Sequence, residues 1–523
     1  MIQRIPLPLV ALVAGAASSF AFAPVGWWPL MILAIAALCE LIARAGSMKR
    51  ALLIGWSFGV GQFAVGLNWI ATAFTYQAAM PAWLGWIAVG LLSLYLAVYP
   101  MLATGLAWRF GKNNRTALVL ALAGSWAITE WLRATMFTGF AWNPIGVALV
   151  ETPLVESGRW IGTYGVSALV ALLSGGLWTI FRREWLLFAG AAVASALLWA
   201  LPAPPEAAVP PPAATGSEDP GGSVIVRPIR IVQPNIGQQD KWRPGFEEVS
   251  AQILDRLTLQ GPPATRLIFW PEAAITDPLE DERPAAAPYT HIKRLRATRT
   301  LASGDLLLTG GLSFTSSNGQ TVDGATNSVY VLGPLGRVAG RYDKAHLVPY
   351  GEYLPMRPLL SSIGLSRLAP GDLDFAAGPG PRTIQLPGNW GRVGFQLCYE
   401  IIFSGDVIDS RNRPDFIFNP SNDAWFGRWG PPQHLAQARL RAAEEGLPVI
   451  RSTPTGISAL IDPYGRLLQS LPWRTAGVID AVLPPPLAPT LFARFGNIIP
   501  LALGFLLLIG AIALDARRRY RRT

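Results

Sequence analysis

Long apolar stretches dominate the first 200 residues of the chain and return near its C-terminal end. A helix that crosses a lipid bilayer needs roughly 20 consecutive apolar residues. Most of the stretches approach that length, although the first and the seventh are short. The apolar stretches are 8–23, 27–43, 51–73, 82–107, 117–136, 160–181, 185–201 and 497–514. The pattern predicts a polytopic membrane protein with about eight transmembrane helices, seven before residue 201 and one after the remaining polar part.

Residues 224–483 follow a different pattern, in which short β-branched runs are bounded by turn residues. Two stretches between these runs, 246–260 and 434–446, have helical composition. Strands that alternate with helices predict an α/β domain. The predicted strands are VIVRPIRIVQPN, LIFWPE, LLLTGGLSF, NSVYVLG, GRVGFQLCYE, DFIFNP and LPVIRSTPTGISALID. A chain of this length is sufficient to bury a substantial core.

The connection between these two parts, residues 202–223, is rich in Pro, Ala and Gly and has no hydrophobic period. Such a composition is typical of an extended linker. The sequence therefore predicts four segments. They are a helical bundle over 1–201, a linker over 202–223, an α/β domain over 224–483, and a membrane helix with a basic tail over 484–523.

The composition excludes a wholly soluble chain, because 51% of the residues are hydrophobic and only 15% are charged, against about 25% charged in globular domains. The net charge of +10 comes largely from Lys and Arg in alternate short connections and in the C-terminal tail. These residues are Arg4, Arg44, Lys49, Arg50, Arg109, Lys112, Arg115, Arg182, Arg183, Arg517, Arg518, Arg519, Arg521 and Arg522.

Positively charged loops stay in the cytoplasm during membrane insertion. The basic connections and the C terminus are therefore expected on the cytoplasmic side. An odd number of crossings before the α/β domain then places that domain outside the cytoplasm. We interpret the basic tail as a topology anchor and expect no nucleic-acid partner.

Three polar residues occupy positions where chemistry is expected. Cys398 ends an apolar strand, and it cannot pair with Cys39, which lies inside the second predicted helix. A free thiol outside the cytoplasm is either buried in the core or used as a nucleophile. Glu272 follows the LIFWP run, at a strand end where catalytic groups project in α/β domains, although a helix cap or a solvated charge would occupy the same position. Lys344, in RYDKAHLVPYGEY, is either functional or the ion-pair partner of Asp343 or Glu352.

In chain order, Glu after WP, Lys in DKxHLVPxGEY and Cys before YE resemble the catalytic triad of the nitrilase superfamily. Together with the membrane helices, the arrangement resembles the apolipoprotein N-acyltransferase family. The resemblance covers nearly the whole chain, with QPN at 233–235, WPE, KAHLVPYGEY, CYE, NPSNDAWFG and GPPQHLAQARLRAAEEG in the expected order. It implies a nitrilase-like four-layer αββα sandwich, inserted between the membrane helices.

The resemblance also implies a two-step acyl transfer. Cys398 would be the nucleophile that forms a thioester with the acyl chain, and Glu272 would be the general acid and base. Lys344 would stabilise the tetrahedral oxyanion together with the backbone N–H of Tyr399. The implied donor is a membrane phospholipid, phosphatidylethanolamine in particular. The implied acceptor is the α-amine of the diacylglyceryl-cysteine of an apolipoprotein, in the last step of bacterial lipoprotein maturation. The domain would lie on the periplasmic side of the inner membrane.

Supporting roles are implied for further residues. Glu352 and Glu400 would either position Lys344 or take part in proton transfer. Trp242, Tyr399 and Trp425 match aromatic positions around the family's acyl pocket or on its mobile loops. A Trp near a membrane serves equally well as an interfacial anchor, so both interpretations stay open.

Two histidines, His346 and His434, raise the question of a metal, but two His without a third ligand make a poor zinc site. We therefore expect no metal and no cofactor. We also expect a monomer, because the membrane bundle would block the surfaces through which soluble nitrilases associate.

Two other functions are compatible with the sequence. A membrane-tethered amidase or nitrilase would use water in place of the amine, and the residues do not distinguish the two acceptors. A transporter or receptor would use the α/β domain only to bind a ligand, since fold alone does not fix function. The predicted helices carry few charges of the kind that line transport paths, with Glu130 and Arg133 as the main exceptions.

Overall fold

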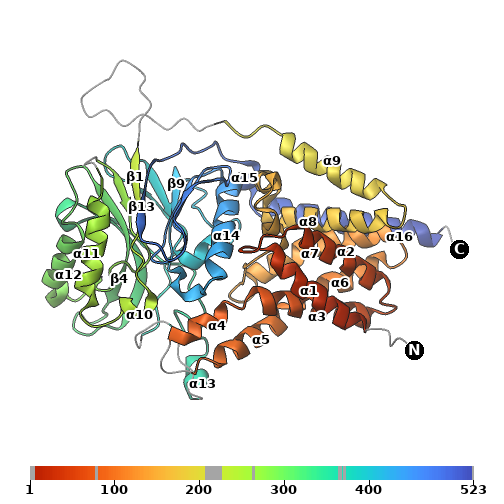
Figure 1. The fold of residues 1–523 in the computed structure, drawn as a ribbon, viewed down its shortest axis with the longest axis horizontal. Helices are drawn as coiled ribbons and strands as arrows, with labels where there is room; N and C mark the ends of the chain where they lie inside the picture. Colours follow the sequence, from red (N-terminus) through yellow and green to blue (C-terminus); the bar gives the residue numbers. More distant parts are fainter. Residues whose placement is uncertain are drawn as a thin grey trace.

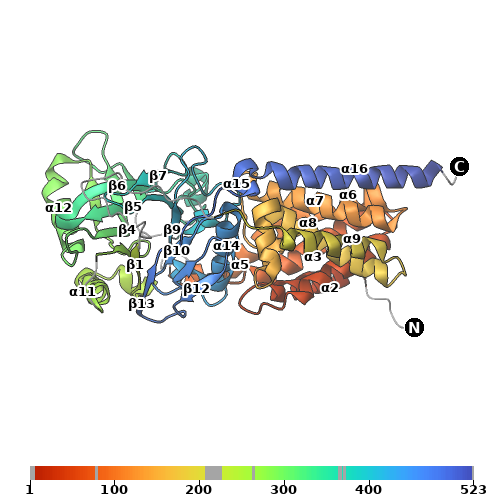
Figure 2. The ribbon, with the colours of Figure 1, turned by 90° about the horizontal axis from the view of Figure 1, so that it is seen from above.

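The computed structural model describes residues 6–76, 81–205, 227–261, 265–362, 368 and 373–520. A helical bundle and an α/β domain lie end to end (Figures 1 and 2). The first helix, α1 (Leu7–Ser18), begins and the last, α16 (Ile498–Tyr520), ends at the end of the bundle that is remote from the α/β domain. From residue 206 onward, the predicted linker 202–223 lies outside the described residues.

Helices occupy all eight of the predicted apolar stretches. The third stretch is divided into two helices that bend by 47°, and the fourth is divided at Ala97. The bundle contains α1 (Leu7–Ser18), α2 (Pro29–Ala43), α3 (Met48–Gly66), α4 (Ile70–Ala73), α5 (Leu84–Leu96), α6 (Val98–Gly111), α7 (Arg115–Thr135), α8 (Gly158–Ile180), α9 (Leu186–Ala200) and α16 (Ile498–Tyr520).

Fewer than eight of these helices are long and apolar enough to cross a membrane. Among the described residues, three stretches pass that test: Leu84–Gly111, Pro153–Ile180 and Ile498–Arg517. The bent pair Met48–Gly66 and Ile70–Tyr76 would make a fourth. The remaining apolar helices α1, α2 and α9 are shorter, and α7 begins with Arg115 and carries Glu130 and Arg133 near its end. The positions of the helices are thus as predicted, whereas eight spans are not confirmed.

The basic connections meet at one end of the bundle. Arg115, at the start of α7, pairs with Glu184 after α8 at 2.6 Å. Arg182 pairs at 2.6 Å with Glu40 near the end of α2. This end lies away from the α/β domain (Figure 1). The shared position agrees with the charge pattern, and the side of the membrane that it faces stays a prediction.

The α/β domain contains two mixed sheets. The first has the order β13-β1-β2-β4-β5-β6, with β3 paired to β4, and the second has the order β12-β11-β10-β9-β8-β7. The first sheet comprises β1 (Pro228–Gln233), β2 (Leu267–Phe269), β3 (Pro278–Asp281), β4 (Leu306–Thr315), β5 (Gly324–Gly333), β6 (Arg337–Asp343) and β13 (Gly477–Val482). The second comprises β7 (Thr383–Gln385), β8 (Arg392–Phe395), β9 (Phe416–Pro420), β10 (Val449–Ser452), β11 (Ala459–Ile461) and β12 (Leu467–Ser470).

Alternating side chains place the two sheets face to face. Phe269 of β2 packs against Phe418 of β9 with ring centroids 4.9 Å apart. Its neighbour Ile268 points the other way, into a core with helices α11 (Phe246–Leu259) and α12 (Ala287–Ala297). Ile417 of β9 joins a third core, which includes α14 (Gly430–Glu445). The layers therefore run helix, sheet, sheet, helix, as the resemblance implies.

The layer that contains α14 is shared with the bundle. One buried cluster combines Tyr399 and Phe403 of the α/β domain with Phe63 and Tyr99 of the helices. Trp142, from the connection between α7 and α8, belongs to the same cluster. We call this contact region the junction. It joins the α/β domain to the bundle through a continuous apolar core.

Candidate active site

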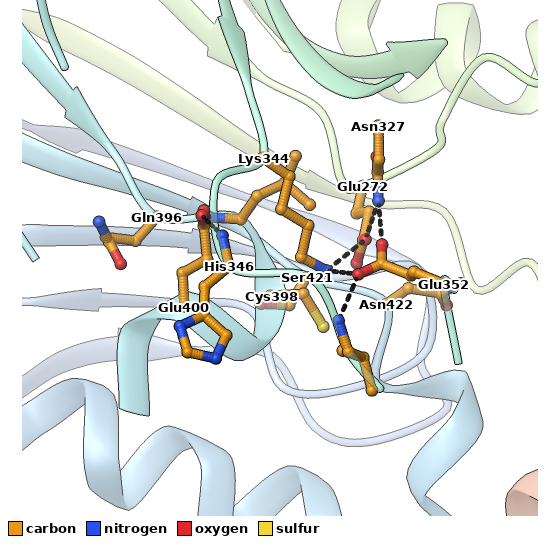
Figure 3. Close-up of polar contacts among 12 residues, drawn as sticks. Glu272, Asn327, Lys344, His346, Glu352, Gln396, Cys398, Glu400, Ser421 and Asn422 are labelled. Atoms are coloured by element: carbon orange, nitrogen blue, oxygen red, sulfur yellow. Dashed lines mark hydrogen bonds and ion pairs between the residues drawn. The ribbon is translucent and has the colours of Figure 1, made fainter. Parts of the chain in front are cut away.

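The three residues singled out in the sequence meet at the ends of strands. Glu272 follows β2 and Lys344 follows β6, both in the first sheet. Cys398 follows β8 of the second sheet and begins a short 3₁₀ turn, η7 (Cys398–Ile402). All three are buried, with exposed fractions of 6%, 1% and 5%. Figure 3 shows their side chains converging, with the Lys344 amine between the carboxylates and the sulfur.

Lys344 lies between two carboxylates. Its Nζ is 2.9 Å from Oε2 of Glu352 and 3.8 Å from Oε1 of Glu272. Burial on its own would lower the pKa of the Lys344 amine, but the two carboxylates outweigh burial and raise it. The amine is therefore a permanent ammonium group at the centre of the site.

Asn327, on β5, holds both carboxylates in place. Its Nδ2 donates to Oε1 of Glu272 at 2.8 Å and to Oε1 of Glu352 at 2.9 Å. The backbone N–H of Val348 donates to Oε2 of Glu352 at 2.9 Å. Among the described residues, Oε2 of Glu272 has no hydrogen-bond partner. Glu352 is thus fixed as a partner for Lys344, while Glu272 keeps one oxygen available.

The thiol of Cys398 sits on a strained turn, since its φ of 53° lies in the left-handed region, which costs a non-glycine residue roughly 1–2 kcal/mol. Burial, and then the Glu272 carboxylate, raise the pKa of the thiol well above its ordinary value. The Lys344 charge and the N–H of Asn422 act in the opposite direction. At rest the group is a thiol, so it needs a base before it can act as a nucleophile.

Glu400 connects the loop that carries Lys344 with the turn that carries Cys398. Its Oε1 accepts from the N–H of Ala345 at 2.7 Å, from the N–H of His346 at 3.0 Å and from the hydroxyl of Tyr342 at 2.8 Å. Its Oε2 accepts from the N–H of Leu397 at 2.7 Å. Burial raises the pKa of Glu400 to about 7. These contacts make Glu400 a clamp between two backbone segments.

The three aromatic candidates lie in different places. Tyr399 is buried, and its hydroxyl donates to the carbonyl oxygen of Gly139 in the bundle at 3.2 Å. The ring of Trp425 packs edge-on against Tyr76 with centroids 5.8 Å apart, so it lies at the junction. Trp242 is 38% exposed and follows the short helix α10 (Gln238–Lys241). Contact of Trp242 and Trp425 with a substrate stays a prediction.

Some residues of the site were missed by the sequence analysis. Asn327 is one of them, and a buried amide inside an apolar strand could have indicated it. Lys241 is another, because its Nζ donates to the backbone oxygen of Glu272 at 3.1 Å. Burial lowers the pKa of Lys241 to about 8, although Glu272 and Cys398 oppose the shift. The site therefore contains a second buried amine beside the catalytic candidates.

The two histidines considered as metal ligands lie in different elements and make different contacts. Nε2 of His346 is 2.8 Å from the carbonyl oxygen of Thr138, and its ring stacks on Phe403. His434 lies inside α14 and contacts the backbone of Cys398. Across the described ranges, no group of three or more His, Cys, Asp or Glu side chains is arranged to hold a metal ion.

The family models define a class of protein in which a carbon-nitrogen hydrolase domain is joined to an apolar helical bundle. Residues 229–488 match a family model described as carbon-nitrogen hydrolase. Residues 14–176 match one described as the apolipoprotein N-acyltransferase N-terminal domain. A solved structure of Saccharomyces cerevisiae Nit3 is 17% identical, with a TM-score of 0.35, and covers 53% of this chain and 95% of its own.

Curated relatives match nearly the full chain. An apolipoprotein N-acyltransferase of Rhodopseudomonas palustris is 36% identical over 94% of this chain and 92% of its own length. One of Bradyrhizobium diazoefficiens is 36% identical over 98% of this chain and 95% of its own. The chain belongs to the apolipoprotein N-acyltransferase family.

Proposed function

We propose that this chain transfers a fatty acyl group from a membrane phospholipid to the free α-amine of a diacylglyceryl-cysteine at the N terminus of an apolipoprotein. The observation that carries the proposal is the packing of the nucleophile turn on the bundle. Tyr399, directly after Cys398, and Phe403, at the end of the same turn, share a buried cluster with Phe63 and Trp142 of the helical part. Both substrates keep their acyl chains in the bilayer, so a thiol at this junction supports a lipid donor.

In the first step the thiol is acylated. Oε2 of Glu272, which is unpartnered among the described residues, takes the thiol proton as the sulfur attacks the ester carbonyl of the phospholipid. The tetrahedral oxyanion is stabilised by the Lys344 ammonium group and the N–H of Tyr399. The ester C–O bond then breaks, and Glu272 returns the proton to the departing lysophospholipid alkoxide. A thioester on Cys398 remains.

In the second step an amine replaces the sulfur. The neutral α-amine attacks the thioester carbonyl, the C–N bond forms and the C–S bond breaks. Glu272 takes a proton from the amine nitrogen and gives it to the Cys398 sulfur, which restores the starting state. An α-amine has a pKa of about 7.7–8.0, so a useful fraction is neutral near pH 7. The sequence of steps needs no metal and no cofactor.

The placement of the chain follows from the same proposal. The catalytic domain, residues 224–483, lies on the periplasmic side of the bacterial inner membrane, and the C terminus lies in the cytoplasm. The gathering of the basic connections at the end of the bundle remote from the catalytic domain supports this orientation. Phosphatidylethanolamine is the expected donor, and the enzyme acts as a monomer.

The decisive test of the reaction is the identity of the acceptor. The enzyme is loaded with acyl groups from phosphatidylethanolamine and then given a diacylglyceryl-cysteine peptide with a free α-amine, or the same peptide with an acetylated amine. We expect mass spectrometry to detect a triacylated peptide from the first and no acylation of the second. Release of free fatty acid at the same rate with and without peptide would make water the acceptor, and the chain would then be an amidase-like hydrolase.

A further inference from the structure

His434 is a buried histidine that the proposed mechanism does not use. It lies on α14, between the second sheet and the bundle (Figure 1), and its side chain is fully buried. Its Nε2 is 3.0 Å from the carbonyl oxygen of Cys398. A carbonyl oxygen only accepts hydrogen bonds, so Nε2 carries a hydrogen and donates it.

The other ring nitrogen is held by an ion pair. Nδ1 of His434 is 3.0 Å from Oδ1 of Asp423 and 3.1 Å from Nη2 of Arg451. Arg451 binds both oxygens of Asp423, at 2.8 and 2.7 Å, and all three side chains are fully shielded from solvent. The pair fixes the plane of the ring, which keeps the Nε2–H group directed at Cys398.

The connection between α7 and α8 packs on the same ring. The indole of Trp142 lies 5.3 Å from the His434 ring, centroid to centroid. Its Nε1 donates to Oε1 of Gln433, the preceding residue of α14, at 2.8 Å. The ring is thus held from one side by Arg451 and Asp423 and from the other by the junction.

The Cys398 carbonyl, which accepts the hydrogen bond from His434, belongs to the same peptide group as the Tyr399 N–H. The C=O of Cys398 and the N–H of Tyr399 are two ends of one planar trans peptide, and they point in opposite directions. A donor that fixes the carbonyl therefore also fixes the direction of the N–H. Hydrogen bonding at the oxygen polarises the peptide as well, which strengthens the N–H as a donor.

We propose that His434 is a positioning residue that orients the Tyr399 N–H toward the oxyanion by holding the Cys398 carbonyl from behind. The inference rests on the proposed function, in which Cys398 is the nucleophile. It accounts for the left-handed φ of Cys398, since a strained residue persists only where its surroundings determine its conformation.

Two amide substitutions of His434 distinguish the roles of its two ring nitrogens. In a helix, the side-chain NH₂ of Gln in His434→Gln reaches the position of Nε2 and still donates to the Cys398 carbonyl. The shorter side chain in His434→Asn reaches only the position of Nδ1 and leaves the carbonyl without its donor. The two variants are alike in polarity and in lost ring packing, so they form a matched pair.

Two reactions of Cys398 separate positioning from damage to the fold. Acylation by phosphatidylethanolamine builds an oxyanion, whereas alkylation by iodoacetamide displaces iodide at carbon and builds none. Both are followed by mass spectrometry of the peptide that contains Cys398. We expect acylation by His434→Asn to fall about 10²-fold, the range found when one oxyanion donor is lost. Its alkylation should stay within about threefold of the wild type. Acylation of His434→Gln should be at least tenfold faster than acylation of His434→Asn.

The outcomes are distinct. Equal losses of acylation in the two variants, or parallel losses of acylation and alkylation, would overturn the positioning role, as would wild-type acylation by His434→Asn. Should His434→Asn fail to fold, His434→Gln decides alone, because a 10²-fold loss of acylation with unchanged alkylation contradicts the inference. A wild-type enzyme that forms no acyl adduct would instead overturn the proposed function and this inference with it.

Discussion

The two helix layers of the α/β domain carry similar charged pairs in very different surroundings. On the outer layer, formed by α11 and α12, Glu248 pairs with Arg296 while its side chain is 54% exposed. At the junction, Glu444 of α14 is completely buried and pairs with Arg441 at 2.8 Å. Ion pairs in water contribute little, whereas a buried charge depends strongly on its partners.

The junction supplies those partners from the bundle. Helix α8 is interrupted at Gly162, whose φ is 65° and ψ is 172°. The break frees the N–H of Thr163, which donates to Oε1 of Glu444 at 2.6 Å, and the Thr163 hydroxyl donates to the same oxygen at 2.8 Å. Ser404, close after the nucleophile turn, adds a third donor at 2.7 Å. The junction is therefore a specific joint, and the outer layer is an ordinary solvated surface.

The largest effect is expected at the centre of the site. Lys344→Met removes the ammonium group that separates Glu272 from Glu352 and contributes to the oxyanion site. Acyl-enzyme formation should fall by about 10²–10³-fold, and stability should fall by about 3–5 kcal/mol, because two buried carboxylates lose their counterion.

Single-turnover kinetics and thermal unfolding measure these two losses. The matched control is Lys293→Met on the outer layer, which breaks a pair with Asp277 at 2.7 Å in which the side chains are 18% and 19% exposed. It should cost less, about 1–2 kcal/mol, with unchanged activity. Similar behaviour of the two variants would remove the distinction between the site and the outer surface.

The second-largest effect is expected at the junction. Glu444→Ala removes the acceptor for Thr163 and Ser404 and leaves Arg441 without its carboxylate, so we expect a loss of about 3 kcal/mol. Glu444→Gln retains an acceptor oxygen and should lose less. Thermal unfolding in detergent compares the two variants, and an alanine variant as stable as the wild type would show that the junction does not depend on this residue.

A smaller, pH-dependent effect is expected at Glu400. Its pKa in the folded protein, about 7, lies above the ordinary value of 4.5, so the folded state binds more protons between these values than the unfolded state. The contribution of Glu400 to the free energy of unfolding is therefore full below about pH 4.5 and is lost as the pH rises through 7. Its total is about 3 kcal/mol.

The variant Glu400→Gln tests this dependence, because an amide does not titrate. Its unfolding temperature, measured from pH 4.5 to 7, should fall less steeply with rising pH than that of the wild type. Parallel curves for the two proteins would contradict the assignment of the slope to Glu400.

The smallest effect is expected on the outer layer. Glu248→Ala breaks the exposed pair with Arg296, which should change stability by less than about 1 kcal/mol and leave acyl transfer unaltered. Thermal unfolding and the acyl-transfer assay measure the two quantities. A loss comparable with that of Glu444→Ala would mean that the outer layer also serves as a joint.

The sequence allowed the interior of the fold to be predicted better than its edges. The strands with continuous apolar runs, such as β4 and β9, were recognised. The four strands that end the two sheets, β6, β13, β7 and β12, were not. Edge strands are partly exposed, and all four residues of β12 are exposed, so they lack the apolar pattern from which a strand is predicted.

At the site, residues beside a sequence motif were predicted, whereas residues that act only through contacts in the folded chain were not. Glu272, Lys344 and Cys398 stand beside recognisable motifs, and their convergence agrees with the resemblance. His434 was weighed only as a metal ligand, because its bond to a backbone carbonyl 36 residues away leaves no pattern in the sequence. Asn327 acts through the spatial proximity of Glu272 and Glu352, which only the folded sheet creates.

The central claim is that Cys398 becomes a lipid-derived thioester. The direct test is the intact mass of the detergent-purified protein after incubation with phosphatidylethanolamine, before and after neutral hydroxylamine. We expect a gain of one fatty acyl group that hydroxylamine removes and that Cys398→Ala does not acquire. An unmodified wild-type protein, or the same adduct on Cys398→Ala, would contradict it.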